Sequence, residues 1–177
     1  GVKTIMNPYL SVVNQKILFC DILLNQGASK KDYLEENNSH QFEIVLCQSA
    51  LYQIECAYLN YLREIAATYQ YKLAESIFSV QGLDAGLRGI NKEPSEIQEI
   101  KSLTESSSSW LFQLLAAFKQ LSLPPSLEVG KSHTQSSSLL EVKQLDDDIH
   151  LSYQLLAAWR QDFVEMIKRH RELMYEC

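Results

Sequence analysis

A carboxylate and an imidazole lie where the sequence predicts buried helix faces, and such a pair could carry acid–base chemistry. Projected at about 100° per residue, Glu55 lies about 50° from the centre of an apolar stripe. His170 lies within the stripe of the last predicted helix, and Asn14 and Asp21 follow one margin of the first. Because a buried carboxylate is costly unless paired, we predict a buried polar cluster of Glu55, His170 and one of Asn14 or Asp21.

This predicted cluster can be a functional site or a structural network, and the same positions allow one geometric alternative. It could be a small-molecule or proton-handling site, since perturbed carboxylate–imidazole pairs are common at active sites. It could equally be a hydrogen-bonded core network that fixes the register of the helices. Alternatively, the same positions could face a groove that is incompletely covered. The first interpretation requires Glu55 and His170 to converge on a closed pocket of about 300 Å³ or more.

Other catalytic and metal-binding patterns fall short of what their chemistry needs. Helical di-iron sites use two Glu-x-x-His pairs, whereas this chain offers only Asp147-x-x-His150 and His40-x-x-Glu43, both at predicted helix ends. A serine nucleophile elbow would need a G-x-S-x-G turn after a strand, and the sequence has neither. We therefore predict no metal and no cofactor, and an enzyme is less favoured than a binding protein.

Length and composition predict one domain spanning residues 1–177. The chain has 46% hydrophobic residues and a formal net charge of −6, which gives no electrostatic footprint for nucleic acid. No stretch reaches 18 uninterrupted apolar residues, so we expect no membrane span, and no secretory signal is evident. The four cysteines lack CxxC spacing and are typical of reduced thiols, which favours a cytoplasmic location.

Helical periodicity dominates the chain, and strand signals are nearly absent. The fold class predicted is all-α, an irregular bundle of five to six helices around one long central helix. A short helix flanked by turns is expected within 72–91, and a Ser-rich connection over 123–148. The main helices are expected at 9–26, 40–71, 94–104, 109–121 and 149–175.

Four groups of helical segments carry a family pattern: Asn14–Ile17 with Phe19, Tyr61–Ala66, Ser109–Leu111 with Gln113–Ala117, and Trp159–Arg160 through Arg171–Glu172. Together they resemble an uncharacterised family of small all-helical bacterial proteins, a domain of unknown function. This resemblance implies an all-helical fold and a bacterial cytoplasmic setting, and it supplies no activity. It directs attention to Asn14, Arg63, Glu64 and Trp110.

Glu64 and Arg63 form a candidate surface or second-layer pair. Glu64 projects on the face opposite the apolar stripe, where a carboxylate is normally solvated. If a second layer of helices covers that face, Glu64 needs a basic partner, and Lys16 and Arg160 are the expected candidates.

The function that these patterns favour is a non-enzymatic protein-interaction or regulatory module. The first helix is apolar on more sides than one neighbouring layer can cover, with Val12, Phe19 and Leu23 outside its main stripe. We expect it to dock a protein partner or a second copy of the chain. The alternative is a small-ligand-binding or enzymatic bundle that uses Glu55 and His170. Binding to a membrane surface is disfavoured because no helix pairs an apolar face with a strongly basic one.

Overall fold

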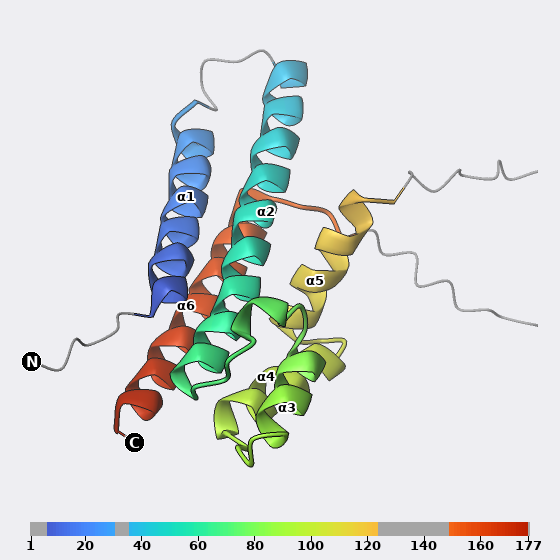
Figure 1. Cartoon of the computed structure of the whole chain (residues 1–177). Coiled ribbons are helices and arrows are strands. Elements are labelled where there is room, and N and C mark those ends of the chain that lie inside the picture. The colour runs from blue at the N-terminus through green and yellow to red at the C-terminus, as the bar shows by residue number, and fades with distance from the viewer. Residues whose placement is uncertain (1–6, 31–35, 124–148, 177) are drawn as a thin grey trace, which may run out of the picture.

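The computed structural model describes residues 7–30, 36–123 and 149–176, which form a single all-helical domain (Figure 1). Among these described residues there are six α-helices, one short 3-10 helix and no strand, which confirms the predicted all-α bundle of five to six helices, while the central position of the longest helix stays a prediction. The helices are α1 (Pro8–Lys30), α2 (Glu36–Thr68), η1 (Ala74–Ser76), α3 (Val80–Arg88), α4 (Ser95–Glu105), α5 (Trp110–Leu121) and α6 (Tyr153–Glu176).

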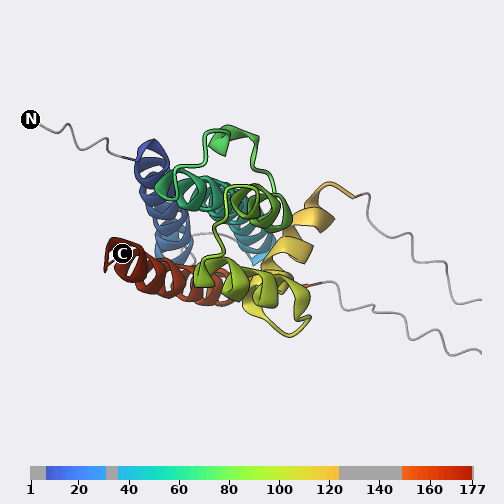
Figure 2. The same cartoon turned by 60° about the horizontal axis from the view of Figure 1, so that its bottom comes forward.

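Helices α1 and α2 run antiparallel and side by side, and α2 also contacts η1, α3, α5 and α6 (Figure 1). The predicted apolar row along α2 faces the interior: its members from Cys47 to Ile65 are buried, and Ile44 and Tyr69 at its ends are half-buried. In the view of Figure 2, α4 lies alongside α6. Since α2 is flanked by neighbours on several sides, more than one of its faces is enclosed.

The first helix continues past residue 26, the predicted end, through Gly27 to Lys30. Gly27 is buried, and a Cβ placed there would lie 2.3 Å from the ring of Tyr153 at the start of α6. The glycine therefore permits a close approach between two helices, and it does not end α1 as a C-cap glycine would.

The second helix begins at Glu36, so residues 37–39, expected before its first turn, lie inside it. It ends at Thr68, three residues before the predicted end, because Gln70 adopts a left-handed φ of 63°. Two backbone bonds, Tyr71 N–H to the Ala66 carbonyl and Gln70 N–H to the Ala67 carbonyl, close this end.

Serine caps start α3 and α5, two shorter helices that contact α2. Ser79 accepts a hydrogen bond from the backbone N–H of Gly82, and Ser109 accepts one from that of Phe112. Ser109 is thus the N-cap of α5, and the short helix expected within 72–91 is α3. Of the Ser-rich connection expected over 123–148, residues 124–148 lie outside the described residues.

Candidate functional site

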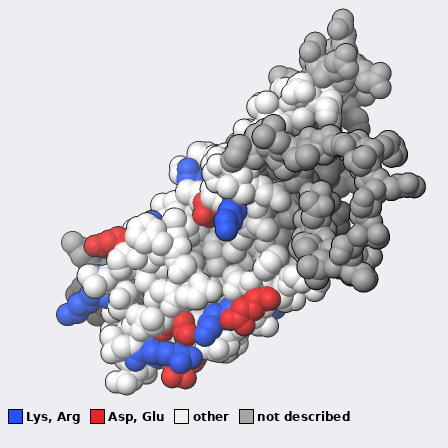
Figure 3. Space-filling view, turned by 90° about the vertical axis from the view of Figure 1, so that its right-hand side faces the viewer, with Lys and Arg blue, Asp and Glu red and all other residues white. Residues whose placement is uncertain are grey.

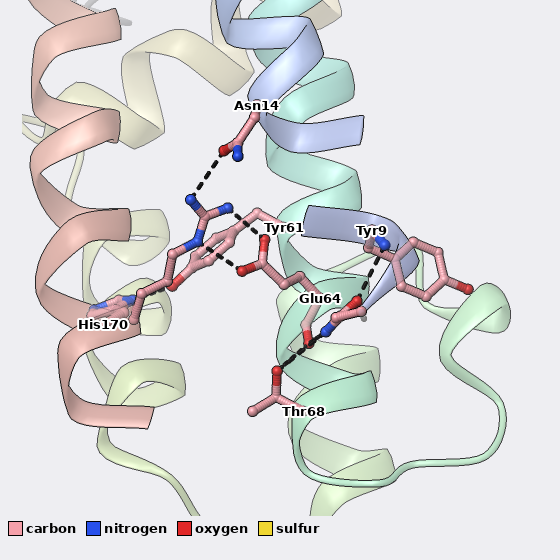
Figure 4. A network of polar contacts seen from close by, with 8 residues as sticks. Tyr9, Asn14, Tyr61, Glu64, Thr68 and His170 are labelled. Atoms are coloured by element: carbon pink, nitrogen blue, oxygen red, sulfur yellow. Dashed lines mark hydrogen bonds and ion pairs between the residues drawn. The ribbon is translucent and has the colours of Figure 1, made fainter. Parts of the chain in front are cut away.

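Glu64, on α2, is buried with 2% of its surface exposed and is paired with Arg171 of α6 (Figure 4). The guanidinium donates to both carboxylate oxygens, from Nε to Oε1 and from Nη2 to Oε2, each at 2.8 Å. Its Nη1 donates to Oδ1 of Asn14 on α1 at 3.0 Å. A single arginine therefore joins three helices, and the bidentate geometry is the strongest form of this pairing.

The first helix is what buries Glu64. Asn7, just before α1, donates to the Glu64 carbonyl at 2.9 Å and to the Thr68 hydroxyl at 3.2 Å. Its Oδ1 accepts the backbone N–H of Tyr9 at 3.1 Å, so Asn7 also caps α1 (Figure 4). The second layer that the sequence analysis considered is therefore present.

The partner of Glu64 is Arg171 rather than Lys16 or Arg160, the two expected candidates. Arg160 is engaged with Asp21, to which its Nη2 donates at 2.8 Å, and the amine of Lys16 lies 5.3 Å from the ring centroid of Phe19. Arg160 and Lys16 thus make other contacts, and the positive charge that pairs with Glu64 comes from Arg171 near the end of α6.

His170 is buried with 1% exposure and bridges α2 to α4. Its Nδ1 lies 2.8 Å from the hydroxyl of Tyr61, and its Nε2 lies 2.8 Å from Oε2 of Glu99. An ionised carboxylate can only accept hydrogen bonds, so Nε2 carries a proton. Arg169 donates to the other oxygen of Glu99 at 2.8 Å.

This Tyr–His–Glu chain has the order of a nucleophile, a base and an orienting acid, but its nucleophile is closed to solvent. Tyr61 has no exposed surface, and burial, with the negative charge of Glu64, raises the pKa of its hydroxyl well above the ordinary value. A substrate in solvent cannot reach the phenol, and the phenolate is strongly disfavoured. The arrangement therefore works as a hydrogen-bonded tie between helices.

The four residues of the predicted polar cluster lie in four different places. Asn14 is exposed and accepts from Arg171, Asp21 is half-buried and pairs with Arg160, and His170 lies between Tyr61 and Glu99. Glu55 lines a different pocket, beside α3 to α5. No hydrogen bond or ion pair among the described residues joins Glu55 to the other three.

Arg63 does not pair with its neighbour Glu64. Its Nε donates to the carbonyl of Ile77 at 3.1 Å, and its guanidinium lies 5.1 Å from the ring centroid of Phe78. Trp110, to which the family resemblance drew attention, is half-buried with its ring centroid 6.2 Å from that of Phe163.

Sequence reasoning missed four residues of these networks: Tyr61, Glu96, Glu99 and Arg171. Glu96 is buried with 3% exposure and accepts the hydroxyl hydrogen of Tyr69 at 3.0 Å. Tyr61 and Arg171 stood within the segments that carried the family resemblance, so that signal could have singled them out.

A groove of about 670 Å³ runs between α1 and α6 next to the Glu64–Arg171 pair. Its apolar lining comes from Ile17, Val164 and Ile167. Arg160, Arg171 and Lys168 line it too, with Asn14 and Glu172. The groove is open to solvent and borders the exposed surface of α1.

Within residues 8–29 of α1, where the exposure of the side chains is described, the exposed residues are all uncharged, and we call this surface the α1 face. Three of them are large and apolar: Leu18 is 55% exposed, Phe19 37% and Ile22 48%. The two charged residues within Pro8–Ser29, Lys16 and Asp21, are half-buried. The α1 face consists of Pro8, Ser11, Asn14, Gln15, Leu18, Phe19, Ile22, Asn25, Gln26, Ala28 and Ser29.

The side of the molecule that carries α3 to α5 differs from the α1 face. There, basic and acidic side chains lie interspersed on a largely uncharged surface (Figure 3). Within the described ranges, no group of three or more His, Cys, Asp or Glu side chains is placed to hold a metal ion. In that same part of the chain, no helix has both the length and the apolar character needed to cross a membrane.

Comparison with known proteins identifies the family of this chain. Residues 6–177 match the model of DUF6586, a family of unknown function, and the chain therefore belongs to that family. This confirms the resemblance to an uncharacterised all-helical family, while the bacterial setting stays a prediction. No curated protein and no solved structure matches the chain.

Proposed function

We propose that this DUF6586 protein is a non-enzymatic, cytoplasmic interaction module that docks a second copy of itself through the α1 face. The observation that carries the proposal is the exposure of Leu18, Phe19 and Ile22 on a helix face without charge. Clustered exposed apolar side chains of this kind are typical of protein–protein contacts.

Charge favours a second copy as the partner. The chain carries a net charge of −6, so two copies repel each other unless they meet at a surface free of acidic groups. The α1 face is such a surface. A two-fold crossing of α1 on its own copy, centred near Leu18 and Phe19, sets the apolar and amide side chains of the two α1 faces opposite one another, and these two faces bring no like charges together.

The available surface has the size that a dimer needs. The α1 face extends over about 30 Å of helix from Pro8 to Ser29, at about 1.5 Å per residue. The α1–α6 groove beside it adds apolar surface from Val164 and Ile167. A stable interface needs about 800 Å² per partner, which one helix with its neighbouring groove can supply.

Sedimentation equilibrium across a concentration series tests the proposal. We expect a reversible dimer for the natural chain and weaker association by about 100-fold or more for Leu18→Glu with Ile22→Glu, because two anchors worth about 1.5 kcal/mol or more each are lost. The matched control is Leu73→Glu with Ile90→Glu, which changes the charge equally at residues that are 57% and 40% exposed elsewhere.

Circular dichroism of both variants establishes that the helices remain folded. A natural chain that stays monomeric at every concentration would overturn the proposal. Equal dissociation of the dimer by the control pair would overturn it too, since the effect would then arise from charge alone.

A further inference from the structure

We propose that a pocket at Glu55 binds a small organic ammonium ion that has an apolar body. The pocket has a volume of about 200 Å³ and lies between α2, the residues leading into α3, and the α4–α5 pair. Its lining includes Glu55 and Tyr58 of α2, Phe78, Val80, Thr104 and Leu115. This proposal does not depend on the α1 face, which contributes no residue to the pocket.

Within the described part of the chain, the carboxylate of Glu55 and the hydroxyl of Tyr58 face this pocket without partners of their own. Among the described residues, neither the carboxylate of Glu55 nor the hydroxyl of Tyr58 has a hydrogen bond, and Glu55 has no ion pair. This sets Glu55 apart from Glu64, Glu96 and Glu99, whose carboxylates are all engaged. Partial burial of the Glu55 carboxylate disfavours its charge, and a cation beside it would offset that cost.

The charge of the pocket is purely negative. None of the described residues that line it is Lys, Arg or His, and Tyr58 is its only other titratable group. Arg63 contacts the lining residue Phe78, but it lies outside the lining and its Nε is held by the Ile77 carbonyl. A ligand cation is therefore the group that would complete the site.

The titration behaviour of the pocket agrees with this geometry. Burial raises the pKa of the Glu55 carboxyl, with no compensating positive charge acting on it. The pKa of the Tyr58 hydroxyl is raised by burial and then by the negative charge of Glu55. An ammonium ion next to Glu55 would favour the ionised carboxylate and would donate a second hydrogen bond to the hydroxyl oxygen of Tyr58.

The rest of the lining suits the apolar body of such a ligand. Leu59, Val80 and Leu115 supply aliphatic surface, and Phe78 is 73% exposed. Aromatic rings near a cation add attraction through their electron-rich faces. The volume equals about seven water molecules at about 30 Å³ each, which fits a one-ring or short-chain amine.

Benzylamine is the probe, and backbone amide NMR titration of the full chain is the measurement. We expect saturable shifts at the amides of the pocket residues, and no comparable binding of benzyl alcohol or benzoate, which share the ring but lack the positive charge. Glu55→Gln should weaken benzylamine binding by about tenfold or more, the usual effect of losing a charged hydrogen bond. The matched control Glu93→Gln removes one exposed acidic charge outside the pocket and should bind normally.

A second variant and a pH series distinguish the contribution of the Glu55 charge to benzylamine binding from that of apolar contact. Phe78→Ala removes an exposed ring and should weaken benzylamine through lost apolar contact, while the fold stays intact. Benzylamine affinity of the natural chain should fall as the pH falls through the raised pKa of Glu55, because the protonated carboxyl is neutral, and Glu55→Gln should abolish this dependence. Absence of saturable benzylamine binding, equal binding of benzyl alcohol, or unchanged affinity in Glu55→Gln would each overturn the proposal.

Discussion

Replacing Arg171 with methionine should destabilise the protein far more than an ordinary surface substitution. The change leaves the Glu64 carboxylate, 2% exposed, without the two hydrogen bonds of 2.8 Å that now compensate its burial. Removing one partner of a buried ion pair costs about 3–5 kcal/mol, because the other charge stays buried and unpaired. Asn14 loses its bond to the guanidinium as well, but its exposed side chain can turn to water.

Arg160 provides the matched comparison on the same helix. It pairs with Asp21 at 2.8 Å, but their side chains are 27% and 33% exposed, so water shares their solvation. Exposed ion pairs contribute about 0–1 kcal/mol, so Arg160→Met should cost much less than Arg171→Met. Arg171→Lys, which keeps the charge and loses the bidentate grip, should fall between the two.

Urea denaturation followed by circular dichroism and by tryptophan fluorescence measures these differences. The double variant Glu64→Leu with Arg171→Met should recover most of the lost free energy of unfolding, since burying two apolar side chains requires no ion pair. A double-mutant cycle then gives a coupling of several kcal/mol. If Arg171→Met costs no more than Arg160→Met, Glu64 is solvated in the folded protein, and the reasoning from its burial is wrong.

Three further predictions follow from other residues. The folded-state pKa of Glu55 is raised above its unfolded value, so the ionised carboxylate lowers the stability of the fold at neutral pH. At neutral pH, Glu55→Gln should therefore raise the midpoint of urea unfolding. This gain should vanish in acid, below the unfolded pKa, where the carboxyl is protonated in both states. Burial raises the pKa of Cys20 to about 12 and that of Cys47 to about 11, so Ellman's reagent should modify Cys56, which is half-buried and free, well before either of them in the native protein. Gly27→Ala should lower stability by about 1–3 kcal/mol despite the helix propensity of alanine, because its methyl overlaps the aromatic ring packed there, and thermal unfolding measures this loss.

The helices were predictable because their signal is local. Apolar residues three and four apart along α2 define its buried row wherever the neighbouring helices lie. Helix ends were less predictable, since they depend on contacts made elsewhere. Gly27 has the residue type of a C-cap, yet its role is to admit Tyr153 from the far end of the sequence.

The polar network could not be predicted from projections on single helices. Glu64 lies outside the apolar stripe of α2, and it is buried because α1 covers a second face of that helix. Its partner Arg171 follows 107 residues later. No periodicity reports which of several basic residues on another helix will reach a given carboxylate.

Glu55 and His170, which were predicted to cluster, do not contact each other, for a related physical reason. The buried surface of α2 is broad enough to meet several helices, so two residues within it can face different neighbours. Tyr61 faces α6 and bonds His170, whereas Glu55 faces Leu115 of α5 and Val80 of α3. The place of a residue within an apolar stripe therefore predicts that the residue is buried, but it does not predict which residue of another helix it contacts.

The polar contacts inside the protein also position α1, and this gives a last prediction. Asn7, just before α1, and Asn14 and Asp21 within it bond to residues of α2 and α6. If docking uses the α1 face as a fixed surface, loosening one tie must cost ordering free energy at association. Arg171→Met should therefore weaken self-association severalfold in sedimentation equilibrium although it replaces no residue of the α1 face. An unchanged association constant in a folded Arg171→Met variant would mean that α1 keeps its orientation through apolar packing alone.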